Sequence, residues 1–99
     1  MSTDAAAAVR PFDLDAAWCL DERVAVRPER FGALLYHFGT RRLSFLKSPG
    51  LLTVVRSLAE HPSARAACAG AGITAPELPR YRSALAALAA SRMIRPRSA

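Results

Sequence analysis

The chain has 99 residues, which suits one small domain, and 52% of them are hydrophobic, a fraction raised by alanine. No apolar run reaches the about 18 residues that a membrane span needs. The N-terminus lacks the positive start and apolar stretch of a signal peptide. Two cysteines, Cys19 and Cys68, lie outside any C-x-x-C pair and the two histidines are far apart, which argues against a zinc site. Free thiols in a reducing cytoplasm are expected.

The net charge of +6 is unevenly distributed. Residues 1–40 carry a net charge of −2, whereas residues 41–99 carry +8. A basic second half suits an acidic partner, which can be nucleic acid, an anionic lipid surface or an acidic peptide. An arginine-rich surface without such a role is the alternative, and charge alone does not choose among them.

Composition also predicts the domain boundaries. Residues 1–11 are small, polar and alanine-rich, which indicates a disordered N-terminal tail. The peptide-binding domain described below is expected over residues 12–95. Residues 96–99 are expected to form a flexible C-terminus.

The domain begins with scattered large apolar residues. Phe12, Trp18 and Leu20 are expected to fold back on the core as a lid or a short helical turn. Residues 23–27 (RVAVR) then place Val24 and Val26 on one face, and a proline follows. This pattern predicts a first strand that ends at Pro28, because proline cannot donate to a strand ladder.

Residues 32–46 predict a β-hairpin that turns at Gly39-Thr40. Glycine at the first central position of a type II′ turn tolerates the positive φ that this turn requires. Such a turn places Tyr36 opposite Leu43. Side chains alternate along a strand, so the large apolar residues then share one face: Leu34, Tyr36, Phe38, Leu43 and Phe45.

The same turn predicts which main-chain groups are free. In a two-residue hairpin, Tyr36 and Leu43 form a hydrogen-bonded pair. The main-chain groups of Arg42, Ser44 and Leu46 are therefore expected to point away from the hairpin. Unless another strand covers this edge, it can accept a foreign strand.

Helix signals follow the hairpin. Ser48 before a proline predicts the start of a helix, and the apolar spacing continues to about Glu60, before Pro62. Ser63 predicts the cap of a short helix that runs through Cys68.

The last helix is expected to end near Arg92. Thr74 and Glu77 match a capping box, although Pro79 can delay the regular helix. The order is three strands and then three helices, which predicts a winged-helix-like α+β domain with its three-stranded antiparallel sheet first. One stripe of this helix carries the larger apolar side chains, between thin alanine flanks: Leu78, Tyr81, Leu85 and Leu88.

Catalytic patterns are missing from the sequence. Cys68 resembles a small buried hydrophobe, His37 a solvated or groove-lining side chain, and His61 a helix-end residue. No phosphate-binding glycine loop occurs, and the carboxylates cluster in the first third of the chain. We therefore expect a protein that is not an enzyme and that holds no cofactor and no metal.

Two binding functions fit these features. The first is capture of an extended acidic peptide, which adds a strand at the open edge and places side chains against the last helix. Basic residues, including Arg80, would attract the peptide and raise the association rate. The alternative is that the apolar stripe is simply core. The candidate peptide-binding residues are Arg41, Arg42, Leu43, Ser44, Phe45, Leu46, Lys47, Tyr81, Arg82, Leu85 and Leu88.

The second function is nucleic-acid binding, because three helices with a β-wing are typical of a winged helix-turn-helix. However, the exposed side of the last helix is rich in Ala and Ser. It lacks the Asn, Gln and interleaved Arg of a base-reading face. We therefore favour the peptide and expect no nucleic acid as a partner.

The stretch RPERFGALLYHFGTRRLSFLKSP, with ELPRYRSALAALAASRMI near the end, closely resembles the mycofactocin-system peptide chaperones. These belong to the PqqD-like family of recognition elements for ribosomally made, post-translationally modified peptides (RiPP recognition elements). The resemblance covers roughly residues 12–95. It implies a non-catalytic protein that binds the leader of a precursor peptide and presents it to a radical S-adenosylmethionine (radical SAM) maturase. That partner would hold the iron–sulfur clusters and would decarboxylate and cross-link the C-terminal Val-Tyr of the precursor.

The resemblance also implies the binding mode. In this family the leader is added as a strand to the third strand, in a cleft closed by the third helix, here residues 42–46 and 81–88. One departure is Lys47-Ser48-Pro49-Gly50, where related sequences often have an Asn/Asp-x-Ser/Thr-Ala stretch. Without peptide, the edge could pair with a second copy, giving a homodimer. No membrane partner is expected.

Overall fold

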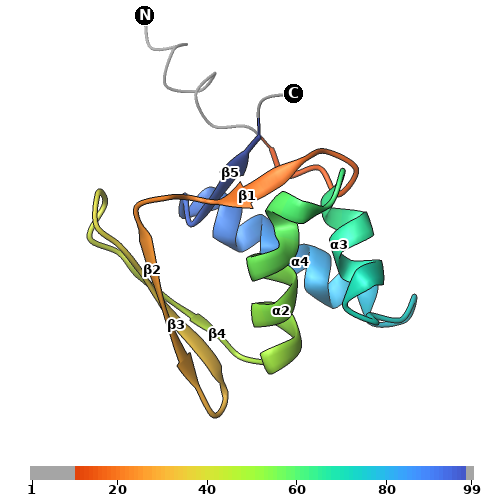
Figure 1. Ribbon diagram of the computed structural model, residues 1–99, viewed down its shortest axis with the longest axis horizontal. Helices are drawn as coiled ribbons and strands as arrows, with labels where there is room; N and C mark the ends of the chain where they lie inside the picture. The colour runs from red at the N-terminus through yellow and green to blue at the C-terminus, as the bar shows by residue number, and fades with distance from the viewer. Residues whose placement is uncertain (1–10, 98–99) are drawn as a thin grey trace, which may run out of the picture.

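The computed structural model describes residues 11–97 and has the predicted α+β fold, with a three-stranded antiparallel sheet and helices that follow it (Figure 1). The predicted fold class is therefore confirmed. No helix formed by the described residues combines the length and apolarity needed to cross a membrane. In chain order the elements are β1 (Trp18–Leu20), β2 (Val24–Glu29), β3 (Gly32–His37), β4 (Leu43–Leu46), α2 (Pro49–Ser57), the 3-10 helix η1 (Leu58–Glu60), α3 (Ala64–Gly70), α4 (Leu78–Ala90) and β5 (Ile94–Pro96).

The larger sheet has the strand order β2-β3-β4. Tyr36 lies opposite Leu43 and Leu34 opposite Phe45, so the predicted hairpin register is confirmed. The predicted end of the first strand is wrong, because β2 continues through Pro28. Proline is tolerated there because β2 is an edge strand and position 28 faces away from β3.

The β3–β4 connection differs from the predicted type II′ turn. It is a four-residue loop, 38–41, closed by the hydrogen bond from the N–H of His37 to the carbonyl of Arg42. The positive φ of 64° belongs to Arg41, whereas Gly39 has no positive φ. The side chain of His37 holds this loop: its Nδ1 accepts the main-chain N–H of Gly39 at 2.9 Å and that of Thr40 at 3.0 Å. His37 is 1% exposed, so the expectation of a solvated or groove-lining histidine is wrong.

Helices α2 and α3 start where the capping residues predict. Ser48 Oγ accepts the N–H of Leu51, and Ser63 Oγ caps α3. The Thr74 capping box does not start α4: Glu77 accepts hydrogen bonds from the N–H and the hydroxyl of Thr74, but the helix begins only at Leu78, consistent with the delay expected from Pro79. The predicted apolar stripe is confirmed as core, because its main members are buried: Tyr81, Leu85 and Leu88.

A second sheet was not predicted. β1 pairs with β5, and Trp18, expected in a lid or helical turn, is a strand residue opposite Pro96. Arg97 donates to the carbonyl oxygens of Leu58 and His61 at 2.8 and 2.9 Å. The folded domain thus includes two of the residues expected in a flexible C-terminus. Of the predicted disordered tail, residues 1–10 lie outside the described residues, as do residues 98–99.

The two faces of the larger sheet have different surroundings. Ala33, Leu35 and Leu46 are fully buried on the face that packs toward α2. The opposite face carries the aromatic residues of the hairpin and is turned away from the helices in Figure 1. The sheet is therefore one outer layer of the domain.

Candidate functional site

One edge of the larger sheet is open. β4 pairs only with β3, and within residues 11–97 no further strand lies along its outer side. The other edge, β2, is less available, because Pro28 has no N–H and the N–H of Val24 already donates to the carbonyl of Asp21 at 3.0 Å. The edge that can accept a foreign strand is therefore that of β4.

The structure corrects which main-chain groups of β4 face outward. The N–H of His37 donates to the carbonyl of Arg42 at 2.9 Å, and that of Phe38 donates to Arg23 on the β2 side. Main-chain groups of a central strand alternate between its two neighbours, so those of Leu35 and Ala33, like those of His37, point toward β4. Their partners Ser44 and Leu46 therefore direct their main-chain groups toward β3. The earlier expectation that Arg42, Ser44 and Leu46 face the edge is wrong.

The outward main-chain groups are instead those of Leu43 and Phe45. The error has one cause: the loop of four residues shifts the hydrogen-bonded pairs by one position while the register stays the same. The edge remains open, but its free donors and acceptors lie one residue away from the predicted ones.

A groove runs beside this edge, between β4 and α4. Its middle section, about 320 Å³, is lined by all of β4 and by small or apolar side chains of the helices. Toward the start of α4 it continues into a hollow of about 410 Å³, and toward the end of α4 a third hollow of about 420 Å³ lies beside the β3–β4 loop. The helical wall of the middle section consists of Leu51, Ala84, Ala87 and Leu88.

Every charged residue that lines these hollows is a cation. Lys47 and Arg80 lie at one end, and Arg42 and Arg92 at the other. Only Arg80 has an acidic neighbour among the described residues, Glu77 at 3.8 Å. An extended peptide with carboxylates toward its two ends would find complementary charge in this groove.

The corner between β4 and α2 is closed by Tyr81. Its hydroxyl lies 3.4 Å from Ser48 Oγ, and Arg80 lies over its ring at 5.9 Å from the centroid. A Cβ on Gly50 would come within 2.5 Å of the same hydroxyl. The Lys47-Ser48-Pro49-Gly50 departure thus has a packing reason, because glycine at position 50 leaves room for Tyr81.

The predicted site residues fall into three groups. Those of β4, together with Arg42, Lys47, Tyr81 and Leu88, line the groove hollows, which brings together most of the predicted set. Arg41 and Arg82 are exposed and line none of these hollows. Leu85 is fully buried beneath the groove, so it supports the wall from behind.

Several lining residues were not in the predicted set. Ala84 and Ala87 could have been found, because they flank the predicted stripe at helical spacing and leave the wall thin. Arg92 could not, because it reaches the groove through a positive φ of 64° without the glycine that signals such a conformation.

The remaining reactive side chains do not gather into a site. Both cysteines are free and buried, and burial raises the pKa of the Cys68 thiol, which keeps it protonated. Within residues 11–97 no group of three potential metal ligands is close enough to hold an ion.

Comparison with known proteins agrees with a peptide-binding site. The model of the peptide chaperone MftB family matches residues 17–95. Peptide chaperone MftB of Mycobacterium ulcerans (strain Agy99) is 57% identical over 95 residues, which cover 96% of this chain and 87% of that protein. The peptide chaperones MftB of Mycobacterium tuberculosis and Mycolicibacterium smegmatis are 56% and 52% identical, over 87% and 97% of this chain and 79% and 93% of theirs. No solved structure matches the chain. The chain therefore belongs to the peptide chaperone MftB family.

Proposed function

We propose that this protein captures the leader of a ribosomally made precursor peptide by strand addition at β4 and delivers it to a radical SAM maturase in mycofactocin biosynthesis. The observation that carries this proposal is the open edge of β4 beside an apolar, cation-ended groove. The related proteins are named peptide chaperones, which supports a peptide ligand.

Strand addition uses the two outward positions of β4. The peptide main chain pairs with the N–H and C=O groups of Leu43 and Phe45, which gives affinity without regard to sequence. Alternate peptide side chains then enter the groove against Leu51, Ala84 and Leu88, and these contacts select apolar residues.

The ends of the groove provide direction and speed. Acidic residues of the leader meet Arg42 and Arg92 at one end, and Lys47 and Arg80 at the other. Such exposed charges raise the association rate and exclude wrong partners more than they add to affinity. The expected dissociation constant is in the nanomolar to micromolar range, about −8 to −12 kcal/mol.

The chemistry belongs to the partner in this proposal. The maturase holds the iron–sulfur clusters and modifies the precursor in the cytoplasm, and this chain contributes only recognition. Without peptide, the β4 edge can pair with a second copy, so a homodimer would compete with leader binding.

A matched pair of variants on α4 tests the proposal. Ala87→Glu puts a bulky carboxylate into the groove, whereas Ser83→Glu makes a similar change at an exposed position that lines none of the hollows. Calorimetry with a synthetic leader peptide should show about tenfold weaker binding or worse for Ala87→Glu and an unchanged dissociation constant for Ser83→Glu. Equal effects of the two changes on the dissociation constant would refute the assignment of the groove as the leader-binding site.

A further inference from the structure

The exposed face of the larger sheet carries a continuous apolar patch. Phe38 is 63% exposed, Phe45 59%, Leu43 56% and Phe31 46%. The rings of Phe31 and Phe45 lie 6.2 Å apart, and those of Tyr36 and Phe38 meet edge to face at 5.0 Å. We define the aromatic face as the surface formed by six residues: Phe31, Leu34, Tyr36, Phe38, Leu43 and Phe45.

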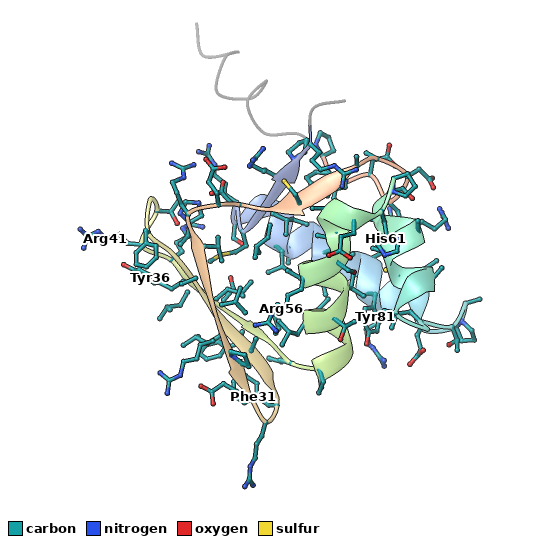
Figure 2. The ribbon with its side chains drawn as sticks, in the orientation of Figure 1. Phe31, Tyr36, Arg41, Arg56, His61 and Tyr81 are labelled. Carbon is teal, nitrogen blue, oxygen red and sulfur yellow. The ribbon has the colours of Figure 1, made fainter. Side chains whose placement is uncertain are left out.

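This aromatic face lies on the opposite side of the sheet from the peptide groove, and of its six members only Leu43 and Phe45 also line the groove, along the edge of β4. Side chains alternate along β4, so Ser44 and Leu46 point toward the helices whereas Leu43 and Phe45 point to the other side of the sheet. In Figure 2, Tyr36 and Arg41 both project from the hairpin away from the helices. Apolar patches of this kind on a small protein mark interaction sites, and clustered aromatic residues are typical of interface centres.

The charges at its rim indicate what covers it. Arg30 follows β2 beside Phe31, and Arg41 lies at the opposite end of the sheet. Neither of these two arginines forms an ion pair within the part of the chain that the structure describes. A second copy would bring the same arginines against its own on a chain of net charge +6, which opposes self-association through this face.

We infer that the aromatic face docks a second protein whose contact surface is apolar at its centre and carries carboxylates at its rim. This inference rests on the proposed function in naming that protein as the modifying enzyme. A leader added at β4 would place alternate side chains on the same side of the sheet as Leu43 and Phe45. The enzyme would then contact chaperone and leader together and bind the loaded chaperone more tightly than the empty one.

The test compares variants of the aromatic face with a variant of the groove, each in the folded full-length protein, for binding of two partners. Phe38→Thr removes apolar area from an exposed member of the aromatic face that lines none of the groove hollows, and Phe31→Thr does the same at the other end of the sheet. Calorimetry with the purified maturase should show about tenfold weaker binding or worse for both variants, with leader binding by Phe38→Thr and Phe31→Thr unchanged. Ala87→Glu should do the reverse, with leader binding lost and maturase binding by the empty chaperone kept.

Three results would overturn the inference. One is maturase binding that neither threonine variant weakens. Another is a wild-type dimer in sedimentation that Phe38→Thr turns into a monomer, which would make a second copy the occupant. The third is wild-type chaperone that binds leader but no maturase, which would leave peptide capture intact and refute both the docking surface and delivery to the maturase.

Discussion

Ser44 of β4 lies directly opposite Leu35 of β3, and the ladder directs the main-chain groups of Ser44 inward while those of its neighbour Phe45 face solvent. Two adjacent residues of one short strand thus have opposite roles. The first holds the sheet together, and the second is free to receive a guest strand.

Proline substitution separates these roles. Phe45→Pro removes an outward N–H and should abolish leader binding, while the domain remains folded because edge strands tolerate proline at such positions. Ser44→Pro removes a ladder bond and should lower the free energy of unfolding by about 1–3 kcal/mol. Chemical denaturation and calorimetry measure the two effects.

Phe45→Ala is the control for the lost ring, because it keeps the N–H. It should bind leader much better than Phe45→Pro does. If the alanine and proline variants lose the same affinity, the side chain and not the main chain of residue 45 recognises the leader.

The buried imidazole of His37 organises the loop that carries Arg41. His37→Leu removes the acceptor for two main-chain N–H groups and should cost about 2 kcal/mol of unfolding free energy. His37→Asn keeps an acceptor oxygen near the position of Nδ1. Hydrogen exchange of the Gly39 and Thr40 amides should therefore be faster in the leucine variant than in the asparagine variant; equal rates would show that the imidazole does not hold the loop.

The sequence predicted the hairpin register, the Ser48 and Ser63 caps and the buried stripe of α4, because each depends on local spacing or on one side chain. It did not predict the inward role of Ser44, because this depends on a loop whose positive φ falls on Arg41 and not on Gly39. A non-glycine residue in that conformation leaves no compositional signal.

The β1–β5 pair escaped prediction for a different reason. Each strand has three residues, and their partners lie at opposite ends of the chain, so no periodicity develops in either. The groove was half predicted: its strand wall follows from the hairpin, whereas Leu51 and Arg92 join it only through the packing of α2 and the end of α4.

Charge at the groove end should act mainly on association. Arg42→Glu reverses a cation that lines the groove, and Arg56→Glu makes the same change in net charge at an exposed position of α2. Stopped-flow mixing with an acidic leader at low salt should show about tenfold slower association for Arg42→Glu than for Arg56→Glu. The difference should shrink at high salt, where exposed charges are screened. Equal rates at low salt would assign the effect to net charge alone.

Acid stability should depend on Asp21. Burial alone would raise the pKa of this carboxyl, but hydrogen bonds from Arg23, at 2.8 Å from its main-chain N–H, and the nearby positive charges outweigh burial and lower the pKa. A carboxyl whose pKa is lower in the folded state stabilises the fold above its unfolded pKa of about 3.9. That contribution disappears as the pH falls through the folded pKa.

Asp21→Asn keeps the shape and an acceptor oxygen but loses the charge. It should therefore destabilise the protein at pH 7, by about 1 kcal/mol, and the difference from wild type should vanish in acid. Glu22→Gln, at the neighbouring exposed carboxylate, controls for the loss of one negative charge. Thermal unfolding between pH 2 and about pH 7 measures both, across the range in which carboxyl groups titrate. A difference between Asp21→Asn and wild type that is independent of pH would mean that Asp21 acts through its shape and hydrogen bonds and not through its charge.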